Sequence, residues 1–377
     1  MYRISLAMTA LLIGMQAACA DDVRIGILMP LTGAGSKYGQ EQKIAVDMFM
    51  EKYEHLDAAA QKLVPFIYDT RWSGTEAISL TRKLIDSDQV AVIVGPMSSG
   101  ESEVAFPVAN RMETPIITPT AAKPGIAAAN RPWAFRNANT SDKLDGALLN
   151  AWLAKQVHPI KSVVIFVDTK DAVSNSDGTL AFPAALKKLG VTILDTISFQ
   201  TGDIDFSAQV TRAKGLRPDG IVLAGLYGES AHVVREARHQ GMMQSIVAGL
   251  EVMDPRFNEL AGSDANGVMS VTDFFAGNQN PTVAAWAQEF EKRYHNPPSN
   301  TAALMYDSLY LTRQCILEHD VLGKNLKADR LAIRDCWAGM KGAEAPLTGA
   351  TTINADGETV RQPAILVIEN EKMISAK

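Results

Sequence analysis

Short apolar runs alternate with longer amphipathic segments along this chain, and the alternation begins twice. In the first half, we expect strands at residues 23–29, 63–68, 90–94 and 115–118 and helices at 39–54, 75–86 and 99–112. In the second half, we expect strands at residues 162–167, 192–199, 220–224 and 245–248 and helices at 142–156, 180–189, 206–213 and 230–240. Strands that alternate with helices form parallel sheets covered on both faces. The sequence therefore predicts an α/β fold of two Rossmann-like, doubly wound lobes.

Three segments fall outside this alternation and are candidate crossings between the lobes. Two of them are residues 136–141 and 274–280, and the tail after Gly357 is the third, which together would make a multi-segment hinge. Additional helices are expected at residues 282–294, 301–318 and 328–338, and additional strands at 348–353 and 364–368. We expect a first lobe of residues 21–140 with 276–350 and a second lobe of residues 141–275 with 351–377.

The first twenty residues have the pattern of a secretion signal. An apolar run at residues 4–15 is too short to cross a bilayer, and the small residues Ala-Cys-Ala at 18–20 follow it. We expect a signal peptide at residues 1–20 that is cleaved after Ala20, which would release the mature protein into the periplasm. A lipoprotein signal that uses Cys19 and a buried N-terminal helix are the alternatives.

Length and charge narrow the class of protein. A chain of 377 residues is too long for one ordinary core and suggests two domains. Its 47% hydrophobic and 21% charged residues are typical of a globular protein. A net charge of −6 without a basic block argues against nucleic acid and anionic membranes as partners.

Two cysteines remain after the expected cleavage. Cys315 and Cys336 both lie on predicted helices, and an isolated pair in an oxidising compartment is usually bridged. We therefore expect a disulfide that joins two helices, with two separate buried thiols as the alternative. A zinc site is disfavoured because no paired histidines stand near the cysteines, and no cofactor is implied.

Polar loops follow several of the predicted strands, at the sheet edge where ligands bind in open parallel sheets. After residues 90–94 comes Gly-Pro-Met-Ser-Ser-Gly-Glu, in which Met97, Ser98 and Ser99 precede or open a helix. Ser98 and Glu101 have the spacing of a capping box, and Ser99 offers a hydroxyl and an N–H to an anion. The sequence predicts a carboxylate-binding loop here, and capping alone is the alternative.

A second loop, Thr-Pro-Thr-Ala-Ala-Lys-Pro at residues 118–124, ends the next strand. Its two prolines restrict the backbone, so we expect the N–H and carbonyl groups of Thr120 and Ala121 to be free for a ligand, with Ala122 beside them. A plain turn is the other interpretation.

Further candidates follow the first strand and two strands of the second half. The segment 32–39 nearly matches a dinucleotide-binding loop, but Tyr38 replaces the third glycine, and we expect an aromatic wall instead. Tyr227 and Glu251 follow strands of the second half, where Glu251 could face an ammonium group or be a surface carboxylate. No G-x-S-x-G, H-E-x-x-H or P-loop motif occurs, so catalytic residues and a metal site are not expected.

Several of these segments together resemble one family. The matching segments are Val23-Arg24-Ile25-Gly26-Ile27 with Leu31-Thr32-Gly33, Val94-Gly95 with Ser98-Ser99, Ile117-Thr118-Pro119, and Arg235-Glu236-Ala237-Arg238 with Gly249-Leu250-Glu251. In these segments the chain is similar to periplasmic leucine/isoleucine/valine-binding proteins. The resemblance extends over nearly the whole mature chain. It implies a type I periplasmic-binding fold, a three-segment hinge, a small-molecule ligand, and a membrane permease of an ABC importer as partner to a monomeric protein.

The resemblance also implies roles for the candidate residues. Ser99 and the loop of Thr120 to Ala122 would hold a carboxylate and an α-ammonium group, Glu251 would add a negative partner for the ammonium, and Tyr38 would wall the site. The chain departs from the family because Ala122 stands where a threonine is usual, and because no aromatic residue is obvious at residues 168–174. These departures leave amides, urea and aromatic acids as alternatives to an amino acid.

Hinge closure is the expected mechanism. Ser99 and Thr120 would bind the ligand on the first lobe, and Tyr227 and Glu251 would contact it only after closure. Two other functions stay open at this point. One is a ligand-sensing receptor component of the same fold, and the other is a secreted hydrolase with Ser99 as nucleophile.

Overall fold

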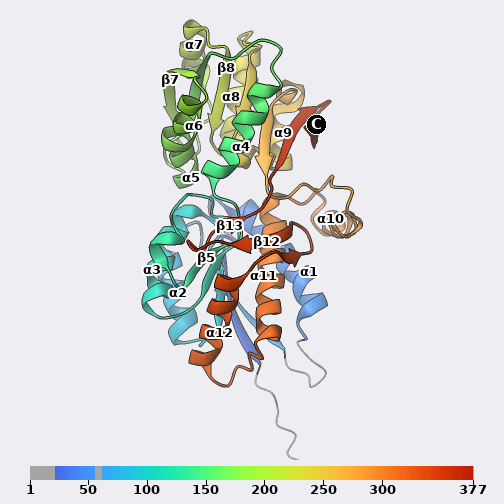
Figure 1. Cartoon of the computed structure of the whole chain (residues 1–377). Coiled ribbons are helices and arrows are strands. Elements are labelled where there is room, and N and C mark those ends of the chain that lie inside the picture. Colours follow the sequence, from blue (N-terminus) through green and yellow to red (C-terminus); the bar gives the residue numbers. More distant parts are fainter. Residues whose placement is uncertain (1–21, 56–61, 377) are drawn as a thin grey trace, which may run out of the picture.

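A computed structural model describes residues 22–55 and 62–376 of the chain. The expected leader and its cleavage site at residues 1–20 lie outside the described residues. The described part is organised around two separate sheets, which lie one above the other with chain crossings between them (Figure 1).

The first sheet has five parallel strands in the order β2-β1-β3-β4-β5. Its strands are β1 (Val23–Met29), β2 (Leu63–Asp69), β3 (Val92–Val94), β4 (Ile116–Thr118) and β5 (Ala134–Arg136). Its covering helices are α1 (Ser36–Tyr53), α2 (Gly74–Asp86), α3 (Ser99–Arg111), α10 (Pro281–Tyr294), α11 (Asn300–Glu318) and α12 (Leu326–Gly339). We call this sheet and its helices the first lobe.

Each face of this sheet has its own core. Ile25 and Ile27 of β1 pack with Phe49 of α1 and with residues of α10, α11 and α12, whereas Leu28 packs with residues of α2 and α3 on the other face. Successive side chains of a strand point to opposite faces, so a strand covered on both sides is apolar throughout. This explains why the buried strands of the chain read as continuous apolar runs.

The second sheet has seven strands in the order β15-β14-β10-β9-β8-β6-β7, and its last two strands in sequence are antiparallel to their neighbours. Its strands are β6 (Ser162–Asp168), β7 (Thr192–Phe199), β8 (Gly220–Ala224), β9 (Ser245–Ala248), β10 (Met269–Thr272), β14 (Ala364–Glu369) and β15 (Lys372–Ser375). Its helices are α4 (Ser141–Ala154), α5 (Ala172–Ser176), α6 (Phe182–Lys188), α7 (Ser207–Leu216), α8 (Tyr227–His239) and α9 (Pro255–Ala261). Residues of α4 and α6 cover one face and residues of α7, α8 and α9 the other. We call this unit the second lobe.

Three segments connect the lobes, namely residues 137–140, 273–280 and 361–363 (Figure 1). A small third sheet of β11 (Ala343–Ala345), β12 (Gly349–Ile353) and β13 (Thr359–Val360) precedes the last crossing. Because β12 pairs with β11 and β13 pairs with β12, both strands belong to the small sheet and not to the second sheet. We therefore propose that the third crossing lies at 361–363, later than the expected boundary at residue 351. For the other boundaries between the two lobes, we propose the positions that the sequence predicts.

The three crossings are tied together by buried hydrogen bonds. In the first crossing, the N–H of Asn139 donates to Asp273 Oδ2 of the second crossing at 2.9 Å. The side chain of Asn139 also donates to the carbonyl oxygen of Arg361 in the third crossing at 3.1 Å, and Arg361 donates to Asn137 Oδ1 at 2.8 Å. Buried polar groups keep their partners, so these bonds hold the three crossing segments in fixed contact.

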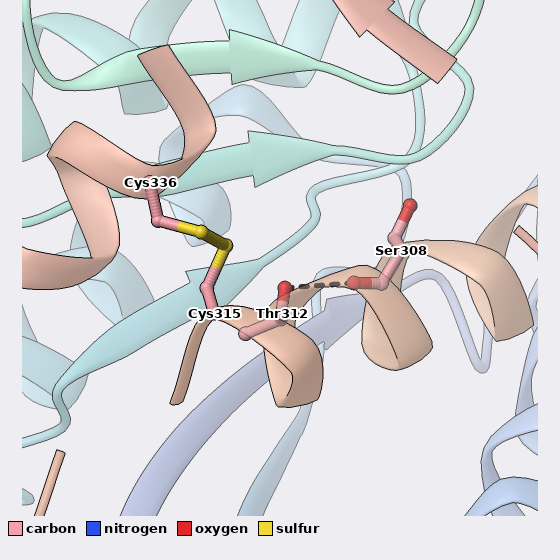
Figure 2. The surroundings of a disulfide bond; sticks show 4 residues. All are labelled: Ser308, Thr312, Cys315 and Cys336. Carbon is pink, nitrogen blue, oxygen red and sulfur yellow. Dashed lines mark hydrogen bonds between the residues drawn. A yellow bond between two sulfur atoms is a disulfide. The ribbon is translucent and has the colours of Figure 1, made fainter. Parts of the chain in front are cut away.

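A disulfide joins Cys315 of α11 to Cys336 of α12, with the two Cα atoms 5.7 Å apart (Figure 2). It connects two helices of the first lobe that pack against the same face of the sheet. One turn earlier on α11, the Thr312 hydroxyl donates to the carbonyl oxygen of Ser308 at 2.7 Å. The disulfide therefore links α11 and α12 of the first lobe covalently.

Several elements differ from the sequence expectations. The expected helix at 180–189 is a longer helical segment, in which α5 leads through a π-helical turn at Asp177–Ala181 into α6. The strands β5, β10 and β15 and the short helix α9 were not expected. They are too short, at three to seven residues, for a period to be recognised. The start of α9 is set instead by Pro255 at its first position and by Asp254 as its cap. Across the described residues, no helix combines the length and hydropathy needed to span a membrane.

Candidate functional site

A cavity of about 70 Å³ lies where the two lobes meet. From the first lobe it is lined by Tyr38, Trp72, Met97, Ser98, Ser99, Thr120, Ala121, Ala122, Ser299, Asn300 and Thr301. From the second lobe it is lined by Asp171, Val173, Leu226, Leu250 and Asp254. A single water needs roughly 10–15 Å³ by the same measure, so the cavity has room for a small molecule.

The loop between β3 and α3 places a serine hydroxyl at this cavity. Ser98 caps α3, because its Oγ accepts from the Glu101 N–H at 3.2 Å while the Glu101 carboxylate accepts from the Ser98 N–H. The next residue, Ser99, is only 4% exposed and opens the helix, where N–H groups have no intrahelical acceptor. Gly95 permits the turn, since it has φ of 113° and a Cβ there would lie 2.2 Å from the Leu28 carbonyl oxygen.

A hydrogen bond from the Lys123 backbone determines how the Ser99 hydroxyl can bind a ligand. Its Oγ accepts a hydrogen bond from the Lys123 N–H at 3.1 Å, which links the first loop to the loop after β4. A hydroxyl that accepts from an N–H still has its own O–H to donate. Ser99 is therefore a donor to any acceptor in the cavity.

The loop after β4 corrects one expectation. The backbone of Ala121 is not free, because its N–H donates to Thr118 Oγ1 at 3.1 Å and its carbonyl oxygen accepts from Arg136 at 2.8 Å. The Thr120 hydroxyl donates to the Met97 carbonyl oxygen at 3.0 Å, so it can only accept from a ligand. Thr118 and Arg136 use these groups to hold the loop in shape. Thr120, Ala121 and Ala122 all line the cavity, as do Met97, Ser98 and Ser99.

Arg136 stabilises the same loop through buried hydrogen bonds. It is fully buried at the end of β5, and it donates to the carbonyl oxygens of Ala121 and Lys123 at 2.8 and 2.7 Å. Its guanidinium also lies 3.3 Å from the Glu358 carboxylate, which accepts from the Gly125 N–H at 3.1 Å. Burial lowers the pKa of Arg136 to about 10, which leaves it charged at neutral pH. Nothing in the sequence around Arg136 indicated this role.

Two aromatic side chains form one wall. Tyr38 stacks on Trp72, with ring centroids 5.9 Å apart and planes 23° apart. Arg71 and Trp72 both have positive φ, at 56° and 59°, which turns the indole toward the start of α1. A Cβ on Gly35 would lie 1.7 Å from the Trp72 ring, so only glycine fits there. Tyr38 was expected as a wall residue, whereas the part played by Trp72 was not.

The second lobe contributes mainly apolar side chains. Val173, Leu226 and Leu250 line the cavity, whereas the expected Tyr227 does not and instead contacts Tyr38 edge to face at 5.8 Å. Asp171 caps α5 by accepting from the Ser174 N–H at 2.9 Å, and burial raises its pKa above the usual range.

The expected Glu251 lies in the 3₁₀-helix Leu250–Met253, and its side chain falls outside the described residues. The segment at 168–174, which lacks an aromatic residue, reaches the cavity through Asp171 and Val173 instead.

Beside the cavity, four polar side chains join the lobes, and we call them the interlobe cluster: Glu41, Asp254, Arg256 and Ser299. Arg256 donates through its backbone N–H and its Nε to Asp254 Oδ1 at 2.9 and 2.6 Å. Across the lobe boundary, its Nη2 lies 3.3 Å from Glu41 Oε1, and the Ser299 hydroxyl donates to the other Glu41 oxygen. The guanidinium also lies over the rings of Tyr227 and Tyr38, at 4.5 and 5.1 Å from their centroids.

Burial sets the electrostatics of the interlobe cluster. Burial, with the nearby charge of Asp254, raises the pKa of Glu41 to about 8 although Arg256 and the Ser299 hydrogen bond act to lower it. Burial acts to lower the pKa of Arg256, but its hydrogen bond to Asp254 and the charges of Asp254 and Glu41 raise it above the usual range. The sequence analysis did not select any of these four residues, because they come from three segments that are far apart in the sequence.

Two doubly wound lobes, a hinge of crossing segments and a small polar cavity between the lobes define a protein that binds a solute in its interlobe cleft. The family model described as periplasmic binding protein matches residues 22–372, and the chain belongs to this family. It is a periplasmic solute-binding protein of the branched-chain amino acid type.

Known relatives cover almost the whole chain. The Leu/Ile/Val-binding protein BraC3 of Rhizobium johnstonii is 25% identical over 355 residues, which are 90% of each chain. The substrate-binding protein LivJ of Streptococcus pneumoniae, solved with isoleucine, has a TM-score of 0.80 at 25% identity and covers 93% of this chain and 97% of its own. A solute-binding protein of Rhodopseudomonas palustris, solved with benzoate, has a TM-score of 0.81 at 18% identity, with 94% and 95% covered. These likenesses show the type I fold with two lobes, and the family is one of solute-binding proteins.

Proposed function

We propose that the cavity captures one small carboxylate and that the protein delivers it to the membrane permease of an ABC importer. The observation that supports this most is the Ser99 hydroxyl, which is buried at the start of α3 and has its proton available for an acceptor. The helix N-terminus beside it favours a negatively charged group. Hydrogen bonds to charged groups gain strength where water is excluded.

The described carboxyl groups at the cavity favour an acid without an ammonium group. Asp254 is bound to Arg256 through both of its oxygens, and Asp171 caps α5. In the described part of the cavity lining, the charge of Asp254 is shared with Arg256, and burial raises the pKa of Asp171, which makes its charged form less favourable. The stacked rings of Tyr38 and Trp72 suit a flat apolar body instead.

The comparisons support two ligand classes. One structural relative was solved with isoleucine and another with benzoate. We favour an aromatic or other apolar monocarboxylate, with a branched-chain amino acid as the second class. For an amino acid, Glu251 is the side chain that we propose as partner of the ammonium group.

A thermal-shift screen followed by titration calorimetry tests the ligand class. The probes are benzoate, benzamide and leucine, added to the mature chain at neutral pH. We expect benzoate to raise the melting temperature and benzamide, which has the same shape without the charge, to leave it unchanged. A shift with benzamide equal to that with benzoate would rule out carboxylate recognition, and a shift with leucine alone would select the amino-acid class.

We further propose that the protein is exported to the periplasm, is cleaved after Ala20 and acts as a monomer. Membership of the periplasmic binding protein family supports this location, and residues 1–20 have the pattern of a signal peptide. N-terminal sequencing of the exported protein should begin at Asp21, and light scattering should give the mass of one chain. A lipid-modified Cys19 or a dimer at micromolar concentration would contradict these two proposals.

A further inference from the structure

The interlobe cluster links the lobes through side chains that are buried together. Glu41 of α1 and Ser299 before α11 belong to the first lobe, and Asp254 and Arg256 at the start of α9 belong to the second. The exposed fractions of Glu41, Asp254 and Arg256 are 2%, 4% and 6%. Opening the lobes would separate Glu41 from Arg256 and return both to water, so these contacts exist only in the closed conformation.

The charges of the interlobe cluster do not balance when every group has its usual charge. Two carboxylates face one guanidinium, and the guanidinium is bound to Asp254 more closely than to Glu41, at 2.6 Å against 3.3 Å. A buried charge without a full partner is costly, and a proton on Glu41 makes the cluster neutral. The Ser299 hydroxyl bonds to Glu41 and can serve either protonation state.

Among the described residues, the other titratable groups near the cluster are three phenols and one carboxylate. They are the phenols of Tyr38 on α1, Tyr227 on α8 and Tyr294 on α10, and Glu229 adds a negative charge near Tyr227. Burial raises the pKa of Tyr227 and of Tyr294 above the usual range. Glu41 is therefore the group whose protonation changes the charge of the cluster.

We propose that the interlobe cluster is a latch that closes with the uptake of one proton by Glu41, so that a lower pH favours the closed conformation before any ligand binds. In the closed conformation the pKa of Glu41 is raised to about 8 by burial, from 4.5 in water. Because the closed pKa is the higher one, the proton's stabilisation of closure is complete below about 4.5. It is lost as pH rises through about 8. The inference concerns the motion of the lobes and does not depend on which solute binds.

The distance between the lobes of the ligand-free protein tests this proposal. Nitroxide labels on cysteines at Arg111 of α3 and Lys187 of α6, which are exposed helical positions on different lobes, report closed and open populations by pulsed electron spin resonance. The mature full chain is measured from pH 6 to pH 9 without ligand. We expect the ratio of closed to open protein to fall as pH rises, by up to about tenfold per pH unit for one proton.

Two variants separate the latch from other effects of pH. Glu41→Gln has the shape and charge of the protonated glutamate, so its closed population should not vary with pH. Glu51→Gln is the matched control, because Glu51 pairs with Arg293 at 2.9 Å inside the first lobe, and it should follow the wild type. A population that is unchanged from pH 6 to pH 9 in the wild type, or that varies equally in Glu41→Gln, would overturn the proposal.

Discussion

One hydrogen bond determines that the Ser99 hydroxyl acts as a donor toward a ligand. The Lys123 N–H occupies an acceptor position of Ser99 Oγ, and the hydroxyl proton must find its acceptor elsewhere. Thr120 is oriented the opposite way, because its proton is taken by the Met97 carbonyl oxygen. The same cavity thus presents one hydroxyl that can donate to a carboxylate and one that can accept from a second polar group where the ligand has one.

Replacing Ser99 by alanine should weaken carboxylate binding by about 1–3 kcal/mol, the range for a hydrogen bond to a charged group. Titration calorimetry measures the change with benzoate or with whichever probe binds. Ser79→Ala is the control, since the Ser79 hydroxyl bonds only within α2, to the Thr75 carbonyl oxygen at 3.1 Å. Equal affinity in Ser99→Ala and wild type would remove Ser99 from the binding site.

Gly35→Ala tests the aromatic wall without altering either ring. The new Cβ would lie 1.7 Å from the Trp72 ring and would force the indole away from Tyr38. We expect affinity for an aromatic carboxylate to fall by about 0.5–1.5 kcal/mol, the value of an aromatic pair. Gly146→Ala on α4 is the control, because a Cβ there meets nothing within 4 Å. If both variants bind alike, the wall does not contact the ligand.

The residues that the sequence revealed lie between the end of a strand and the first turn of the helix that follows it. The edge of the first sheet brings these residues to one cavity: Tyr38, Met97, Ser98, Ser99, Thr120, Ala121 and Ala122. Trp72, Glu41 and Arg256 were missed because they reach the site through a left-handed turn or a contact between lobes. Tyr227 was misplaced by one residue, since Leu226 is the side chain that lines the cavity.

At the scale of elements, strand β5 connects the hinge to the ligand loop. Arg136 ends this strand, precedes the first crossing and binds the carbonyl oxygens of Ala121 and Lys123. It also pairs with Glu358, which stands just before β13 and the third crossing. The segments that lead into two of the crossings therefore contact the loop after β4 through one guanidinium.

Arg136→Met should lower the free energy of unfolding by about 3–5 kcal/mol, because it leaves the Glu358 carboxylate without its buried partner. Urea denaturation of the ligand-free protein measures this change. Arg212→Met is the control, since Arg212 pairs with Asp195 at the surface, where such a pair contributes about 0–1 kcal/mol. A loss in Arg136→Met no larger than in the control would show that the buried pair does not hold the loop.

Long elements were predictable and short ones were not. The strands β1, β7 and β8 and the helices α1, α2 and α11 have enough residues for an apolar run or a helical period to be recognised. The strands β5 and β10 have three and four residues and are specified by their neighbours in the sheet. The π-helical turn between α5 and α6 has no period of its own, which is why one shorter helix was expected there.

At the scale of the whole molecule, the cavity exists because two independent cores meet through a hinge and a few side chains. Each sheet is buried on both faces by its own helices, so the lobes are stable bodies that can move against each other. Contacts that form on closure include those of Tyr38 with Tyr227 and of Glu41 with Arg256, together with those of a ligand. A ligand that touches both lobes shifts the balance toward the closed conformation by its differential affinity.

A crystal structure of the protein with benzoate tests the central claim most directly. The account predicts a closed protein in which a carboxylate oxygen lies within hydrogen-bonding distance of Ser99 Oγ and the ring lies between the Tyr38–Trp72 wall and Leu226. A benzoate that binds outside the interlobe cavity, or inside it with its carboxylate turned toward the second lobe and away from Ser99, would contradict the account.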